Sequence, residues 1–178
     1  MRDKARNACY VKPSSGFHGV CVRVFVGWYG SADYLCHLLV WSEFMPVRII
    51  TDSGSEYRSS DHPALEVLPL TVAFGDDVYR EGVDITYDQF YEMLTEREEF
   101  PSTGQATPFL FQEALERARE AGEDVVVITM SSRLSGTYQN ACMAAAAARE
   151  AGLETVRVVD SLNMTPGERI VVQDALQL

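Results

Sequence analysis

The run DVVVITM, residues 124–130, constrains the fold of this chain more than any other stretch. Its side chains do not alternate between apolar and polar, so a strand formed here is apolar on both faces, as in parallel sheets covered by helices. Helical patterns lie on either side of it in the sequence, at residues 108–122 and 137–152. A strand between two helices at this short spacing predicts an α/β fold, in which a parallel sheet has helices on both faces.

Further strands are predicted where short runs are rich in β-branched and apolar residues, at residues 47–51, 65–74 and 155–160. Pro69 lies inside the second of these runs, which places that run at a sheet edge or at a bulge. Residues 75–85 then predict a turn with a short hairpin.

The helix starts carry recognisable capping sequences. Thr86 and Gln89 are spaced as a capping box. Thr107 is followed by a proline at the first position of the next helix. Pro166 is placed to open a last helix, and Gly122 to stop the helix before the central strand.

Two features are assigned to the hydrophobic core in preference to a ligand site. Phe90, Met93 and Leu94 recur at helical spacing, and we expect this stripe to pack in the hydrophobic core; the alternative is that it lines a lipid groove. Cys142 lies on an alanine-rich helix and is interpreted as a small core residue.

Composition divides the chain at residue 45. Residues 1–45 hold five Lys or Arg and three Asp or Glu, whereas residues 46–178 hold ten Arg, no Lys and 23 Asp or Glu. We therefore treat 1–45 as an atypical leader and 46–178 as the folded domain. The formal net charge of −11 disfavours binding to nucleic acid or to anionic membrane surfaces.

The leader carries no clear targeting signal. Pro13, His18 and Arg23 interrupt its apolar stretches, and no run approaches the roughly 20 apolar residues of a membrane span. Its cysteines lack the close spacing of a zinc site. The favoured hypothesis is a start-site artefact with translation beginning at Met45; the alternative is an extension that packs as an extra strand. The acidic, cysteine-poor remainder predicts a cytoplasmic protein.

Hydroxyl side chains gather where the predicted strands end. Thr51, Asp52 and Ser53 follow the first strand, four more hydroxyls follow the central strand within residues 131–137, and Ser161 follows the strand at 155–160. In open parallel sheets, ligands bind beyond the carboxyl ends of the strands. The pair Ser102 and Thr103 precedes its own helix and is expected to fold over the same edge.

The segment LSGTYQ, residues 134–139, predicts an anion site. Ser135 is placed as an N-cap, with the amides of Gly136, Thr137 and Tyr138 free at the start of the helix. Free amides and the positive end of the helix dipole attract an anion, and the glycine permits close approach. The alternative is that Ser135 only caps its helix.

Catalytic chemistry lacks the residues that it needs. Arg133 stands where a nucleophile elbow requires glycine, and His62 is the only histidine after the leader. A P-loop needs a lysine, which this part of the chain lacks. The acidic residues 76–88 do not have the spacing of a calcium loop, so neither catalytic residues nor metal ligands are predicted.

Five segments resemble the DegV family in their order and spacing. That family includes FakB, the fatty-acid-binding subunits of bacterial fatty acid kinase. The resemblance covers residues 46–178 and excludes the leader. The segments are VRIITDSGSEY, VLPLTVAFGDDVYREGVDITYDQFYEML, PSTGQATP, SSRLSGTYQNA and VRVVDSLNMTPG.

The resemblance implies a fatty-acid-binding protein, not an enzyme in its own right, whose ligand is a long-chain fatty acid and which needs no cofactor or metal. A separate ATP-dependent fatty acid kinase phosphorylates the carboxylate that such proteins present. The carboxylate-binding residues implied for this chain are Thr103 and Ser135, with Ser102 and the amide of Gly136 nearby. Supporting positions are implied for Asp52, Ser53, Gln105 and Thr137.

Three departures from the family pattern leave a second hypothesis open. Gly104 stands where the family has serine, and Arg133 replaces a glycine, so that it either pairs with the carboxylate or faces water. The chain also ends in QDALQL, where family members continue into a second domain that walls the lipid pocket. The alternative is therefore a truncated, non-functional DegV fragment that cannot enclose lipid.

Overall fold

The computed structural model describes residues 21–23, 41–43 and 46–178, and the chain divides into two compact units, Met1–Met45 and Pro46–Leu178. In the first unit, β1 (Cys21–Arg23) pairs antiparallel with β2 (Trp41–Glu43). Most of the leader lies outside the described residues, so both hypotheses about it stay predictions.

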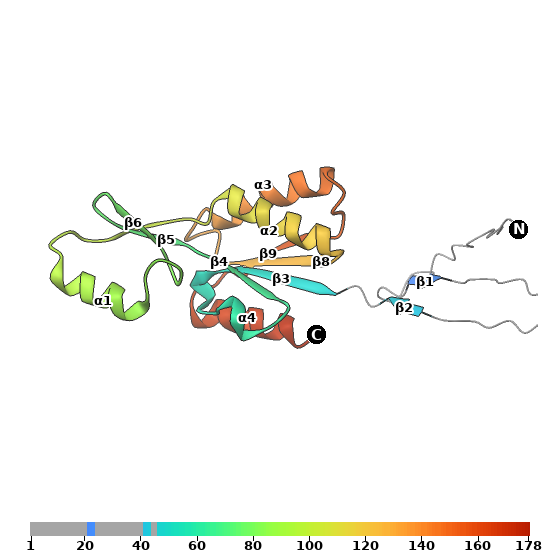
Figure 1. The fold of residues 1–178 in the computed structure, drawn as a ribbon, viewed down its shortest axis with the longest axis horizontal. Helices are drawn as coiled ribbons and strands as arrows, with labels where there is room; N and C mark the ends of the chain where they lie inside the picture. Colours follow the sequence, from blue (N-terminus) through green and yellow to red (C-terminus); the bar gives the residue numbers. More distant parts are fainter. Residues whose placement is uncertain (1–20, 24–40, 44–45) are drawn as a thin grey trace, which may run out of the picture. The chain divides into compact units, whose positions relative to one another are not determined.

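The second unit is built on a parallel sheet with the strand order β4-β3-β8-β9 (Figure 1). Its strands are β4 (Leu65–Leu68), β3 (Val47–Asp52), β8 (Asp124–Thr129) and β9 (Arg157–Asp160), and each neighbouring pair is parallel. The predicted central strand β8 lies between β3 and β9 and is apolar on both faces. This confirms the predicted α/β architecture.

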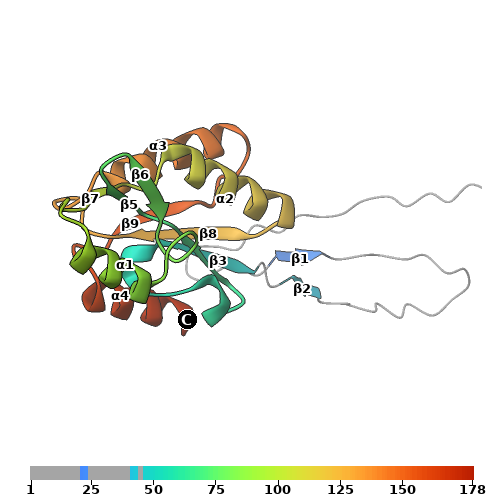
Figure 2. The ribbon, with the colours of Figure 1, turned by 60° about the vertical axis from the view of Figure 1, so that its left-hand side comes forward.

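Helices cover both faces of the sheet (Figures 1 and 2). On one face, α2 (Pro108–Ala121) and α3 (Thr137–Glu150) pack together over Ile50, Val125 and Val127. On the other face, α4 (Pro166–Leu176) places Val172 against Ile49, Leu65 and Ile128. Successive side chains along a strand point to opposite faces of the sheet, so neighbouring strand residues belong to different clusters.

The alanine-rich side of α3 carries its packing. Ala141, Ala144 and Ala145 are fully buried, and their small side chains let the helix lie close to the sheet. Cys142, which follows the first of these alanines, is only half-buried. The prediction that Cys142 is a core residue was therefore wrong, because the buried stripe passes to one side of it.

Helix starts follow the predicted caps. Thr86 and Gln89 form the reciprocal capping box at α1 (Tyr87–Glu96). The Thr107 side chain accepts a hydrogen bond from the Leu110 amide at α2, 3.4 Å away. Gly122 ends α2 with φ of 70°, a left-handed conformation that glycine adopts without strain.

The apolar run 65–74 is not one strand. It divides at Pro69 and Leu70 into β4 of the parallel sheet and β5 (Thr71–Phe74) of a second, antiparallel sheet with the order β6-β5-β7. Proline has no amide hydrogen to continue a ladder, and the Leu70 amide donates to the Ser53 side chain instead. The 3-10 turns η1 (Ser53–Ser55) and η2 (Ser59–Asp61) connect β3 to β4.

The antiparallel sheet and α1 form a lobe, residues 71–104, that extends from the carboxyl ends of the parallel strands (Figure 1). We call it the α1 lobe, and the remainder of residues 46–178 the sheet core. The predicted hairpin at 75–85 is present, since β6 (Asp77–Arg80) pairs with β5. Residues 102–104, expected in a loop, form β7 (Ser102–Gly104), which pairs with the other edge of β5.

Helix α1 has no buried residue, so the prediction of a core-facing stripe was wrong. Phe90 and Met93 are half-buried, and Leu94 is exposed. The Phe90 ring packs against Phe74, with 5.9 Å between ring centroids. The helix covers the small antiparallel sheet from one side only, and this lobe is too small to enclose it.

Candidate ligand-binding site

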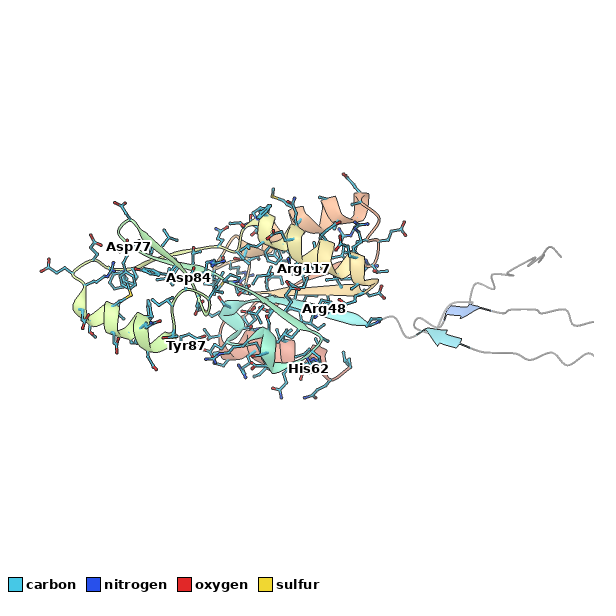
Figure 3. The ribbon with its side chains drawn as sticks, in the orientation of Figure 1. Arg48, His62, Asp77, Asp84, Tyr87 and Arg117 are labelled. Atoms are coloured by element: carbon cyan, nitrogen blue, oxygen red, sulfur yellow. The ribbon has the colours of Figure 1, made fainter. Side chains whose placement is uncertain are left out.

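The carboxyl ends of β3, β8 and β9 meet at the edge of the sheet that faces the α1 lobe (Figure 1). The hydroxyl-rich corners predicted to meet there follow these strands. His62 lies just before β4, at the amino ends of the strands and away from this edge (Figure 3). The only histidine of residues 46–178 is therefore not placed to activate a serine at the candidate site.

Asp52 ties the ends of β3 and β8 together. Its side chain is fully buried, with Oδ2 accepting from the Met130 amide at 2.9 Å and Oδ1 accepting from the Gly54 amide at 3.0 Å. Burial raises the pKa of this carboxyl to about 6, against the lowering effect of those two amides. Asp52 therefore organises the edge from beneath, with both oxygens occupied.

Ser53 connects the edge to the α1 lobe. Its hydroxyl donates to Glu81 Oε2 at 2.7 Å and accepts from the Leu70 amide at 3.0 Å. The Ser53 oxygen is thus engaged twice within the protein.

The loop after β8 is held by its own backbone and by the loop after β9. The Ser131 amide donates to the Asn163 carbonyl at 2.7 Å, and the Ser135 amide donates to the Ser131 carbonyl at 3.1 Å. The Ser132 amide donates to Asp160 Oδ1 at 3.1 Å. Arg133 is exposed at the tip of this loop.

The helix α3 begins at Thr137, as its sequence pattern predicted, but Ser135 does not occupy the expected N-cap position, because Gly136 is the capping residue. The Ser135 hydroxyl accepts from the Thr137 amide at 3.2 Å and lies 2.9 Å from the Thr137 hydroxyl. Only two of the three predicted amides remain available: among the hydrogen bonds of residues 46–178, none is donated by the amides of Gly136 or Tyr138.

Gln105 brings the segment after β7 against the start of α3. A Cβ atom added at Gly136 would lie 2.6 Å from Gln105 Oε1, so glycine is needed for this contact. The Asn140 side chain donates to Gln105 Oε1 at 3.2 Å and to the Ala106 carbonyl at 2.9 Å. These contacts join two predicted site segments that are more than 30 residues apart in the sequence.

Ser102 and Thr103 are exposed on β7, opposite Ala73 and Val72 of β5. The neighbouring Gly104 faces Thr71 so closely that an added Cβ atom would lie 2.2 Å from the Thr71 hydroxyl oxygen. A serine here would require Thr71 to move, which gives this departure from the family pattern a local structural reason.

A cavity of about 650 Å³ lies between the α1 lobe and the sheet core. Its volume falls within the range of small-molecule sites. The sequence did not predict it, because the residues that line it come from separate segments. They include Leu70, Val72, Val83, Ile85, Tyr87, Phe90 and Tyr91, with Ser53, Glu81 and Thr103 as polar members. Figure 3 shows Tyr87 at the end of α1 nearest the core.

The structure therefore brings the predicted residues into two adjoining groups. Thr103 lines the cavity, whereas Ser135 and Gly136 lie outside its lining, with Gly136 packed against Gln105. Within residues 46–178, no three His, Cys, Asp or Glu side chains gather as metal ligands. No helix of those same residues is long and apolar enough to cross a bilayer.

Glu168 is a buried acid near the end of β3 that the sequence did not single out. It is fully buried in the first turn of α4, where its Oε1 accepts from the Thr51 hydroxyl at 3.2 Å. Burial, and then the charge of Asp52, raise its pKa to about 8. An acid in the first turn of a helix is ordinary in sequence because it complements the helix dipole, so nothing marked this residue.

A family model described as "Uncharacterised protein, DegV family" matches residues 46–178. This chain belongs to the DegV family. A DegV domain-containing protein of Clostridium acetobutylicum is 38% identical over 135 residues, which cover 74% of this chain and 47% of that protein. The chain spans about half the length of the curated relatives that it matches.

Solved structures of DegV relatives share the fold. A stearic acid-binding protein from Eubacterium ventriosum has a TM-score of 0.68 and 27% identity, covering 74% of this chain and 46% of its own. The fatty acid kinase (Fak) B3 protein of Streptococcus pneumoniae, loaded with linoleic acid, has a TM-score of 0.67 and 26% identity. That match covers 75% of this chain and 48% of the relative. These neighbours bind fatty acids.

Proposed function

We propose that this DegV chain binds a long-chain fatty acid and presents its carboxylate to a separate, ATP-dependent fatty acid kinase. The apolar cavity beneath the α1 lobe, with the Thr103 hydroxyl in its lining, is the observation that carries this proposal. A fatty acid needs an apolar space for its tail beside a polar site for its head, and this edge of the sheet offers both.

The proposed head-group site consists of Thr103, Ser135 and the Gly136 amide, with Ser102 at its rim. The amides of Gly136 and Tyr138 lie at the start of α3, where the helix dipole favours an anion. Asp52, Ser53, Gln105 and Thr137 are engaged in hydrogen bonds within the protein, which suits the supporting positions proposed for them.

The charge of Glu81 supports this orientation of the ligand. Glu81 lines the cavity and accepts a hydrogen bond from Ser53. A fatty-acid carboxylate placed beside Glu81 would be repelled, and it would find the Ser53 hydroxyl already engaged. The head group is thus disfavoured beside Glu81. Arg58 also lines the cavity, and we place the head group at Thr103 because that residue leads into Gln105, which packs against Gly136 at the start of α3.

The tail should set most of the affinity. Burial of a methylene contributes about 0.8 kcal/mol, so roughly 14–16 carbons contribute on the order of 10 kcal/mol before the cost of lost freedom. Each hydrogen bond to the charged head contributes about 1.5–3 kcal/mol, much of it offset by dehydration of the carboxylate. The hydroxyl groups therefore position the head more than they retain the lipid.

The kinase proposal rests on the exposure of the edge. Ser102, Thr103 and Arg133 are exposed, so a carboxylate held there is open to a second protein. In this proposal the chain supplies the ligand and the kinase supplies the chemistry. The exposed guanidinium of Arg133 is then available either to the carboxylate or to the kinase.

Lipid binding can be tested by native mass spectrometry. The protein is stripped of lipid with organic solvent, incubated with palmitate and sprayed under non-denaturing conditions. One palmitate per chain is the expected result. A folded protein that takes up no fatty acid at any concentration would contradict the proposal and favour the alternative of a chain unable to enclose lipid.

Ser135→Ala tests whether the hydroxyl groups position the head group while the tail sets the affinity. We expect palmitate affinity to change by less than about threefold, while phosphorylation by the kinase subunit falls about tenfold, because the carboxylate is displaced. Thr155→Ala, at an exposed position before β9, is the matched control. Complete loss of bound lipid from a normally folded Ser135→Ala protein would contradict the assignment.

A further inference from the structure

Two buried carboxyl groups face one glycine beneath the candidate site. Asp52 and Glu168 are both fully buried, although they come from β3 and α4 and are far apart in the sequence. A Cβ atom added at Gly54 would lie 2.8 Å from Asp52 Oδ1 and 3.4 Å from Glu168 Oε2. One oxygen of each carboxyl therefore borders the space left by the missing glycine side chain.

Among residues 46–178, Glu168 Oε2 has no hydrogen-bond partner, although it is buried. The other oxygen of the same carboxyl accepts from the Thr51 hydroxyl. An ionised carboxylate offers only acceptors, whereas a protonated one also offers a donor. A buried oxygen with no donor near it is costly for the charged form of a carboxyl and much less so for the neutral acid.

No cation compensates the pair. None of the ion pairs formed among residues 46–178 involves Asp52 or Glu168. Arg169, the next residue of α4, turns away to stack over the Tyr57 ring at 4.1 Å and to donate to the Glu56 carbonyl. The remaining charged group that acts on Asp52 is Glu81, which adds a third negative charge and is held by Ser53.

We propose that Asp52 and Glu168 form a proton-binding site, which holds one proton near neutral pH and thereby removes a buried charge that would oppose the docking of α4 on the carboxyl end of β3. The proton comes from solvent during folding and is retained chiefly on Glu168. Asp52 stays ionised to a lower pH than Glu168, because two backbone amides donate to Asp52 and none donates to Glu168. This inference does not depend on which ligand the edge binds.

The pKa shifts of the two groups agree with the geometry. Burial raises the pKa of Glu168 to about 8, and that of Asp52 to about 6. The positive end of α4 acts in the opposite direction on Glu168 and does not outweigh burial. Between the unfolded pKa of about 4.5 and the folded pKa of about 8, the folded chain holds a proton at Glu168 that the unfolded chain releases. The free energy of unfolding should therefore fall as pH rises through this window.

The proton also supports the candidate site. Asp52 holds the Met130 amide at the end of β8, and the carbonyl of Asn163, in the loop that leads into α4, accepts from the Ser131 amide. Both contacts anchor the loop that carries Ser135. Loss of the proton would weaken the seating of α4 and thus one of the two anchors.

Glu168→Gln tests the proposal, because glutamine mimics the size and donor capacity of the protonated acid. Urea unfolding of the whole chain is measured from about pH 5 to about pH 9 for the wild type, for Glu168→Gln and for Glu113→Gln, an exposed control on α2. The unfolding equilibrium constant of the wild type, relative to Glu168→Gln, should rise by up to about tenfold per pH unit until about pH 8. Glu113→Gln should follow the wild type, and parallel curves for wild type and Glu168→Gln would overturn the proposal.

A measurement on the unmodified protein covers the case in which the variant does not fold. With glutamate labelled at the carboxyl carbon, infrared or NMR titration should show one carboxyl that stays protonated until about pH 8. Ionisation of every glutamate by about pH 6 would overturn the proposal. Recovery of wild-type stability at high pH by millimolar Mg²⁺ or Ca²⁺, absent in Glu168→Gln, would also overturn it, in favour of a cation site.

Discussion

The sheet core and the α1 lobe adjoin the same cavity but are built in opposite ways. The core has strands covered on both faces and fully buried side chains from three helices, such as Phe111 and Val172. The lobe has three short strands and a helix with no buried residue. The core fixes the buried polar groups of the edge, whereas the lobe provides apolar wall and the exposed Ser102 and Thr103. The lobe has few buried side chains, Phe74 among them.

This difference teaches where stability and specificity reside. Side chains that fix the edge, such as Asp52 and Gln105, belong to the core or to the segment that returns to it. Side chains that shape the apolar cavity, such as Phe90 and Tyr91, belong to the lobe. Substitutions should therefore separate into those that unfold the chain and those that change what it binds.

The largest expected effect is on stability. Phe111→Ala, in the core, should lower the free energy of unfolding by about 3–5 kcal/mol, because it leaves a cavity among fully buried neighbours. Phe90→Ala, in the lobe, should lower it by less than about 1.5 kcal/mol, because that ring is only half-buried. Urea unfolding measures both, and equal losses would remove the distinction between the two regions.

A smaller effect is expected on ligand affinity, and here the substitution in the lobe matters. Phe90→Ala should weaken palmitate binding roughly fivefold to thirtyfold, since about 1–2 kcal/mol of apolar contact is lost. Leu94→Ala, on the same helix but outside the cavity lining, is the matched control. Fluorescent displacement titration distinguishes them, and equal affinities would show that the tail does not lie beneath α1.

The smallest effect concerns the exposed surface of the lobe. Arg80 forms a bidentate ion pair with Asp84, and the side-chain hydrogen bond from Arg80 lowers the pKa of that carboxyl to about 2. In Arg80→Gln, the NMR titration midpoint of Asp84 should rise toward its ordinary value, with little change in urea stability. Any stability from this pair is present above about pH 3.8 and is lost as pH falls through about 2. A large loss of stability at neutral pH would show that the lobe depends on its surface charges.

The parallel sheet could be predicted from sequence because its signals are local. The apolar run of β8, the Thr86–Gln89 box and the Thr107–Pro108 start each depend on neighbours within a few residues, and the structure contains all three. The family was recognisable for the same reason, since its motifs are short and contiguous.

What could not be predicted depends on contacts between distant segments. β7 is a strand only because β5 offers it an edge, and Phe90 lines a cavity only because the lobe folds back toward Ser53. Glu168 has the sequence signature of an ordinary first-turn acid, and its burial against Thr51 arises from the docking of α4. The N-cap of α3 is Gly136 and not Ser135, whose hydroxyl engages Thr137 instead.

The pairing of Thr71 with Gly104 has a consequence for how such a protein can diversify. The chain enters the α1 lobe at Thr71 and leaves it at Gly104, and these two residues are paired on neighbouring strands. The two ends of the lobe therefore lie next to each other. Its contents can be exchanged for those of a relative without moving the sheet that holds the polar edge. A family could thus change which lipid tails it accepts by exchanging lobes. Ser102 and Thr103 would be exchanged with the lobe, whereas Ser135 and Gly136 would stay with the sheet core.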